Sequence, residues 1–87
     1  MSSTIDETIK FISNNVFVPH ENANKICYGL HSFGSDSIIS YNNDIWKFIW
    51  FKSNTNEAIY INKKGNMHAF NTFTMINENI IRMKKVK

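Results

Sequence analysis

The stretch Ile45–Lys52, IWKFIWFK, decides the fold because it is aromatic or β-branched almost throughout. In an extended chain, successive side chains point to opposite faces. Regular alternation gives each face three large apolar side chains: Trp46, Phe48 and Trp50 on one, and Ile45, Ile49 and Phe51 on the other. A strand that is apolar on both faces is usually central in a sheet. The sequence therefore predicts a β-sheet built around residues 45–52.

Shorter strands are expected on both sides of this stretch, at residues 37–42, 58–61 and 67–73. The turn-prone Asn42-Asn43-Asp44 follows the first of them. Residues 62–66 fit a short hairpin connection between the other two, in which Gly65 supplies a left-handed position. These segments predict a four-stranded antiparallel meander.

Helical signals precede the meander. Thr4 and Glu7 form a capping-box pattern, and Ile5, Ile9 and Ile12 recur near helical spacing, which predicts a helix over residues 4–14. Pro19 suits the start of a helix and Gly34 its end, so a second helix is expected over residues 20–32. The alternation of Ile26, Tyr28 and Leu30 would also fit a strand, which remains an alternative for that segment.

The C-terminal segment is ambiguous. Ile76, Ile80 and Met83 favour a short helix over residues 75–83, whereas alternation from Ile81 to Lys85 favours a strand. The expected class is α+β, with two N-terminal helices, the four-stranded antiparallel meander and a short C-terminal helix. With 87 residues, 43% of them hydrophobic, the chain is expected to form one compact domain, residues 1–87, with a frayed basic tail at 84–87.

Cys27 is the only cysteine, so the chain forms no internal disulfide, and a reducing compartment is expected. The N-terminal residues lack a basic and apolar signal sequence, and no apolar run approaches the about 20 residues of a membrane span. We therefore expect a soluble, cytoplasmic protein with no membrane partner. Its 13 Asn, 13 Ile and 9 Lys indicate an AT-rich genome. No motif points to a known family, and small proteins of this kind are typical of phages and mobile elements.

Motifs for catalysis are sparse. Cys27 and His31 lie four residues apart and would share one face of the second helix, a geometry open to a nucleophile–base pair. A zinc site would need further ligands, and the chain has no CxxC, HxxxH or phosphate-binding glycine loop. We therefore predict no catalytic residues, no metal site and no cofactor. A small enzyme that uses Cys27 and His31 stays as an alternative.

Charge divides the chain into two unlike halves. Residues 1–44 have a net charge of −3 and residues 45–87 a net charge of +6, within an overall +3. Lysines near exposed aromatic rings can hold a phosphate backbone while the rings stack on bases. The basic candidates are Lys47, Lys52, Lys63, Lys64, Arg82, Lys84 and Lys85, and the candidate aromatic anchors are Trp46, Trp50 and Tyr60.

The leading hypothesis is a non-enzymatic protein that docks a nucleic acid, or a host protein that handles nucleic acids, and inhibits by occlusion. It predicts that Lys63→Glu with Lys64→Glu weakens binding. The structural alternative is that these lysines are solvated and the rings form the core. A second functional class is an antitoxin-type or immunity-type protein module, which would bind through the acidic helical half with Glu21 and Asp36.

Overall fold

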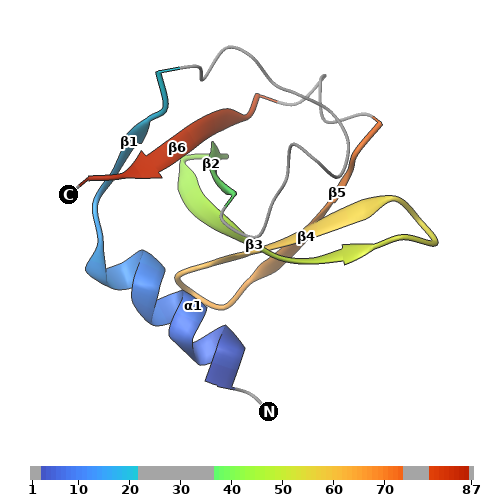
Figure 1. Ribbon diagram of the computed structural model, residues 1–87, viewed down its shortest axis with the longest axis horizontal. Coiled ribbons are helices and arrows are strands. Elements are labelled where there is room, and N and C mark those ends of the chain that lie inside the picture. Colours follow the sequence, from blue (N-terminus) through green and yellow to red (C-terminus); the bar gives the residue numbers. More distant parts are fainter. Residues whose placement is uncertain (1–2, 22–36, 74–78, 87) are drawn as a thin grey trace.

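The antiparallel sheet that the sequence predicts is present, and it has six strands (Figure 1). The computed structural model describes residues 3–21, 37–73 and 79–86. The elements are α1 (Ser3–Asn14), β1 (Phe17–Pro19), β2 (Ile38–Tyr41), β3 (Asp44–Lys52), β4 (Glu57–Asn62), β5 (Met67–Asn71) and β6 (Ile81–Lys85). The strand order is β1-β6-β2-β3-β4-β5. The α+β class and the meander from β2 to β5 are confirmed.

The two ends of the chain depart from the sequence-based prediction. The first helix is confirmed as α1, but Pro19 ends the short strand β1 where a second helix was expected to begin. Most of the predicted helix 20–32 falls outside the described residues. Residues 81–85 form β6, so the strand alternative is right there and the predicted C-terminal helix does not extend to Met83.

The predicted frayed tail is wrong for residues 84–86. Lys84 lies opposite Val18 and Lys85 opposite Phe17 in the β1–β6 pair. The N–H of Val86 then donates to the carbonyl of Val16 at 2.9 Å. The physical reason is long-range: β6 fits between β1 and β2, so that residues 81–83 pair with β2 and residues 83–85 pair with β1.

One face of the sheet carries an aromatic core. Its buried members are Ile39, Trp46, Ala58, Tyr60, Phe70 and Ile80. The Tyr60 ring meets Phe48 and Phe70 edge-on, with centroid distances of 5.7 and 5.4 Å. Edge-to-face contacts of this kind add to the burial of apolar area. The aromatic side chains that the sequence placed around the strands are therefore mainly core.

The opposite face of the sheet is covered in part by α1, which contacts β3 and β4. Ile12 of α1 is buried, as are Ile38 of β2 and Ile61 of β4 on this face. A Cβ added at Gly65 would lie 3.8 Å from Cδ1 of Ile9, so α1 also reaches the β4–β5 hairpin (Figure 1). The helix thus seals a second, aliphatic layer.

A β-bulge interrupts β3 and changes which side chains share a face. The register with β4 shifts between Phe48 and Trp50, leaving Ile49 as the extra residue. Trp50 therefore lies opposite Ile59, and Phe51 lies opposite the core residue Ala58. The predicted alternation is correct for Trp46 and Phe48 and wrong for Trp50 and Phe51, which exchange faces.

Polar side chains hold the two hairpins next to each other. The Asn62 amide is buried and donates to Oδ2 of Asp44 at 2.8 Å. Its Oδ1 accepts from the backbone N–H groups of Lys64 at 3.1 Å and Asn66 at 2.9 Å. Gly65 has a φ of 84°, as the sequence predicted for this hairpin.

The only described helix, α1, has 12 residues, too few to cross a bilayer.

Candidate polyanion-binding surface

Two lysine side chains from distant parts of the chain meet at the ring of Phe11. The Nζ atoms of Lys47 and Lys85 each lie 6.0 Å from the centroid of that ring. The Phe17 ring lies beside it, with centroids 5.8 Å apart and planes at 60°. Phe11, Phe17, Lys47 and Lys85 are called the Phe11 cluster below. They come from α1, β1, β3 and β6.

The sheet register explains why these four side chains meet. Residues directly opposite in neighbouring strands point to the same face. Lys47 lies opposite both Ile38 and Ile61, which are buried on the face of the sheet that carries α1, and Lys85 lies opposite Phe17. The side-chain amide of Asn15 donates to the carbonyl of Phe11 at 2.7 Å, at the end of α1 where the chain turns into β1.

The electrostatics of the Phe11 cluster favour an anion. A ring at this distance offers an ammonium group about 0.5–1 kcal/mol when the site is exposed. Two positive charges near one ring also repel each other by an amount that depends on their separation, and a bound anion offsets that repulsion. Lys85 is exposed, and its three N–H donors are more than a ring face can accept. The cluster is therefore suited to a phosphate group.

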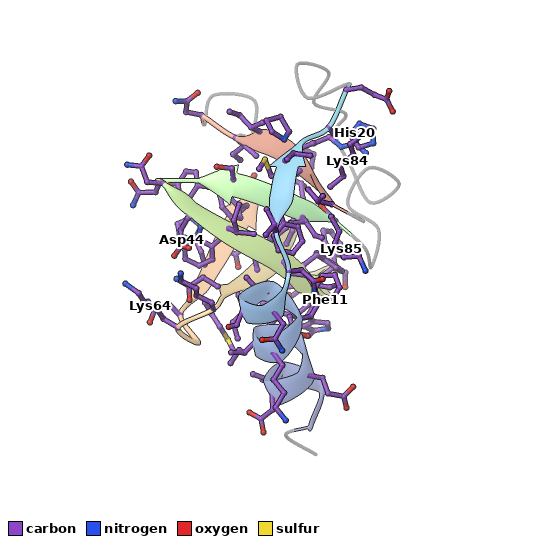
Figure 2. All side chains as sticks on the ribbon, turned by 90° about the vertical axis from the view of Figure 1, so that its left-hand side faces the viewer. Phe11, His20, Asp44, Lys64, Lys84 and Lys85 are labelled. Atoms are coloured by element: carbon purple, nitrogen blue, oxygen red, sulfur yellow. The ribbon has the colours of Figure 1, made fainter. Side chains whose placement is uncertain are left out.

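The remaining predicted basic residues do not all join this cluster. Lys84 is exposed and adjoins Lys85 in β6. Figure 2 shows Lys84 and Lys85 with His20 on one side of the molecule, and Lys64 with Asp44 on the other.

Three of the other candidates lie in different surroundings. Lys63, like Lys64, is exposed in the β4–β5 hairpin, and Lys52 lies opposite Glu57. Arg82 is half-buried and lies opposite the core residue Ile39. Its positive charge has a small lowering effect on the pKa of Tyr60. The structure thus brings Lys47 and Lys85 together and separates the rest. Lys84 adjoins Lys85 in β6, but its side chain points to the opposite face of the sheet, the face of Arg82 and Ile39.

Two of the three predicted aromatic anchors are core residues. Trp46 is 8% exposed, and its indole N–H donates to the carbonyl of Tyr41 at 3.0 Å. Tyr60 is fully buried, and its hydroxyl shares a 2.7 Å hydrogen bond with Ser37. Burial raises the pKa of Tyr60 far above its usual value, against smaller lowering effects of Ser37 and Arg82. Only Trp50, 59% exposed, is available at the surface.

Phe11 and Phe17 are not among the site residues that the sequence predicts. Phe11 fits the apolar pattern of α1, and Phe17 belongs to a strand of three residues, too short to show periodicity. Their role depends on the pairing of residue 17 with residue 85, for which no local signal exists.

The alternative functional residues fall mainly outside the described ranges. Cys27, His31 and Asp36 all lie there, whereas Glu21 is an exposed turn residue shortly after β1. Within residues 3–21, 37–73 and 79–86, no three His, Cys, Asp or Glu side chains are grouped so that they could hold a metal ion.

Comparison of the chain with protein-family models, with curated proteins and with solved structures finds no match.

Proposed function

We propose that the protein is a non-enzymatic, cytoplasmic binding protein that docks a nucleic-acid strand on the Phe11 cluster, and acts by occluding that strand. The observation that carries the proposal is the approach of Lys47 and Lys85 to one aromatic ring. Phosphates of a nucleic acid are the anions that a cluster of lysines most readily engages, with release of counterions.

The residue types favour charge-driven binding over base reading. Base-specific contacts in DNA grooves most often use the planar guanidinium group of arginine. The single arginine of the chain, Arg82, is half-buried beside the aromatic core. Lysines act as point charges, so we expect binding that depends strongly on salt and weakly on base sequence.

The test compares two variants with the same change of charge. Lys84→Glu with Lys85→Glu alters the cluster side, and Lys63→Glu with Lys64→Glu alters the hairpin. Fluorescence anisotropy with labelled oligo-dT and oligo-U of about 20 nucleotides measures the affinity between about 50 and 300 mM salt. We expect the Lys84/Lys85 variant to lose at least about 10-fold in affinity at low salt, and the hairpin variant to lose less.

We therefore expect the main binding contribution from the β1–β6 side, whereas the sequence alone favoured the hairpin with Lys63 and Lys64. Equal losses in the two variants would mean that net charge alone governs binding, against the proposal. Absence of binding by the wild-type protein at about 50 mM salt would contradict it outright. The protein-module alternative would be favoured if the protein captures a partner from host extract even after nuclease treatment, and if Glu21→Lys abolishes that capture.

A further inference from the structure

The outer edge of β5 exposes backbone groups in a regular pattern. In the described part of the chain, β5 pairs with β4 only. Backbone hydrogen bonds join Asn62 to Asn66 and Thr72 to Asn56. Because bonded pairs in an antiparallel ladder recur every second residue, His68 and Phe70 point their backbone groups toward β4. Met67 and Ala69 therefore point theirs outward.

Among the described residues, β5 itself carries none of the sequence features that usually prevent strand addition. Natural sheets protect their edges with short strands, proline, bulges or charged side chains, especially lysine. At the opposite edge, β1 has three residues and ends in Pro19. The five residues of β5, MHAFN, include no proline, lysine, arginine or acid, and Phe70 anchors the strand in the aromatic core.

We propose that β5 is a dimer interface, where it pairs antiparallel with β5 of a second copy so that Ala69 meets Ala69 across a two-fold axis. Such an interface is self-complementary, because each copy presents the same donors and acceptors in reverse order. The small side chain of Ala69 at the centre allows the two strands to approach without a clash.

A row of apolar side chains runs up to this edge on the face of the sheet that carries α1. Trp50, Ile59 and Ala69 lie opposite one another across β3, β4 and β5. Trp50 is 59% exposed and Ala69 is exposed, beyond the part of the face where α1 buries Ile61. A two-fold axis perpendicular to the sheet joins the rows of two copies into one apolar band on one face of the extended sheet.

Charge favours this antiparallel arrangement. Antiparallel pairing sets the β4–β5 hairpin of one copy, with Lys63 and Lys64, beside the β3–β4 turn of the second copy. The first charged residue inward from that end of the edge is Glu57, which lies opposite Asn71. A parallel pairing would instead bring the two basic hairpins side by side, which like-charge repulsion disfavours.

The dimer proposal does not rest on the proposed function. The Phe11 cluster includes side chains of β1 and β6, at the other end of the strand order from β5. A dimer through β5 leaves both clusters open to a ligand. Failure of nucleic-acid binding and failure of dimerisation are therefore separate outcomes.

Light scattering after size exclusion tests the proposal on the full chain. The expected result is a mass that rises from 10.2 kDa toward twice that value as the concentration increases from about 5 μM to 1 mM. Met67→Lys with Ala69→Lys should raise the dimer dissociation constant at least about 100-fold. The matched control, Val16→Lys with Val86→Lys, adds the same charge at exposed positions beside the β1–β6 pair and should leave it unchanged.

Amide hydrogen exchange gives a second readout that needs no variant. The amide protons of Met67 and Ala69 should exchange more slowly at high protein concentration, because only the dimer protects them. A wild-type protein that stays at 10.2 kDa up to about 1 mM overturns the proposal. So does a dimer that persists in the β5 variant and is lost in the control.

Discussion

Tyr60 is the residue at the centre of the aromatic core. It is fully buried, its ring contacts Phe48 and Phe70, and its hydroxyl shares a hydrogen bond with Ser37. The hydroxyl is therefore a buried polar group whose partner lies near the start of β2. A buried group of this kind contributes about 1 kcal/mol through its hydrogen bond and is costly to ionise.

The raised pKa of Tyr60 predicts a loss of stability at alkaline pH. A group whose folded pKa lies above its unfolded pKa of about 10 contributes stability that is present below that pH and lost above it. At pH 7, Tyr60→Phe should lower the free energy of unfolding by about 1 kcal/mol, because Ser37 loses its partner. Urea denaturation should show this gap closing between about pH 9 and 11.

Ser37→Ala is the control for this prediction. It removes the same hydrogen bond but keeps the ionisable ring, so its free energy of unfolding should still fall steeply with alkaline pH. If the curves of wild-type protein and Tyr60→Phe run parallel up to about pH 11, the buried hydroxyl is not the cause.

At the scale of single residues, the candidate site was only partly predictable. The lysines that form the Phe11 cluster were in the predicted basic set, because charge is visible in the sequence. Which of these basic residues come together could not be predicted, because the approach of Lys47 and Lys85 to Phe11 depends on strand pairing across some 70 residues. Trp46 and Tyr60 are buried because they point to the face of the sheet that carries the aromatic core, and the sequence alone does not show which face is covered.

Among the elements, the bulge in β3 has the largest effect on what the surface displays. In a regular strand with Ile49 paired in the ladder, Trp50 would share the face of Trp46 and Phe48 and add to the aromatic core. With it, Trp50 joins Lys47 and Ile59 on the opposite face. Bulges of this kind re-aim side chains and are not readable from alternation alone.

The bulge predicts opposite outcomes for the same substitution at the two tryptophans. Trp46→Ala should lower the free energy of unfolding by about 3–5 kcal/mol, because it empties a buried site and removes the indole N–H that donates to the Tyr41 carbonyl. Trp50→Ala should cost less than about 1 kcal/mol, since the side chain is mostly exposed. Chemical denaturation followed by circular dichroism compares the two.

Fluorescence provides an independent check on the same pair. The chain has two tryptophans, so Trp50→Phe leaves Trp46 as the only emitter and Trp46→Phe leaves Trp50. Acrylamide should quench the emission of Trp50 more strongly. Equal quenching would show that the exchange of faces at the bulge is not present in solution.

The success of the sequence-based prediction varied with element length. α1 and the strands β2 to β5 have several periods of apolar pattern or clear turn residues, and each was located to within about two residues. The strand β1 has three residues and contains a proline, which as readily indicates a helix start. For β6, helical spacing was preferred and the strand was the alternative, and tertiary pairing with β1 and β2 produces the strand.

On the scale of the whole molecule, the sheet separates two apolar layers, and β6, the last described element along the chain, lies inside the sheet. The aromatic core occupies one face, and α1 with its aliphatic contacts occupies the other. β6 lies between β1 and β2, so it connects the segment after α1 to the meander. Loss of β6 pairing should therefore affect the whole domain.

A chain that ends at Met83 tests this role. It loses the backbone pairing of Lys84, Lys85 and Val86 with β1 and Val16, and should be about 2 kcal/mol less stable to urea. Lys84→Gln with Lys85→Gln keeps the backbone and should stay within about 0.5 kcal/mol of wild type. An unchanged stability of the shortened chain would return these residues to a frayed tail.

The strand order also sets the timing of folding during synthesis. β1 is made early, but its partner in the sheet, β6, is encoded some 60 residues later. At roughly 5–20 residues per second, the ribosome leaves β1 without that partner for several seconds. The β2–β5 meander pairs only neighbouring strands and can form without β6, yet the sheet closes only after residues 81–85 have left the exit tunnel.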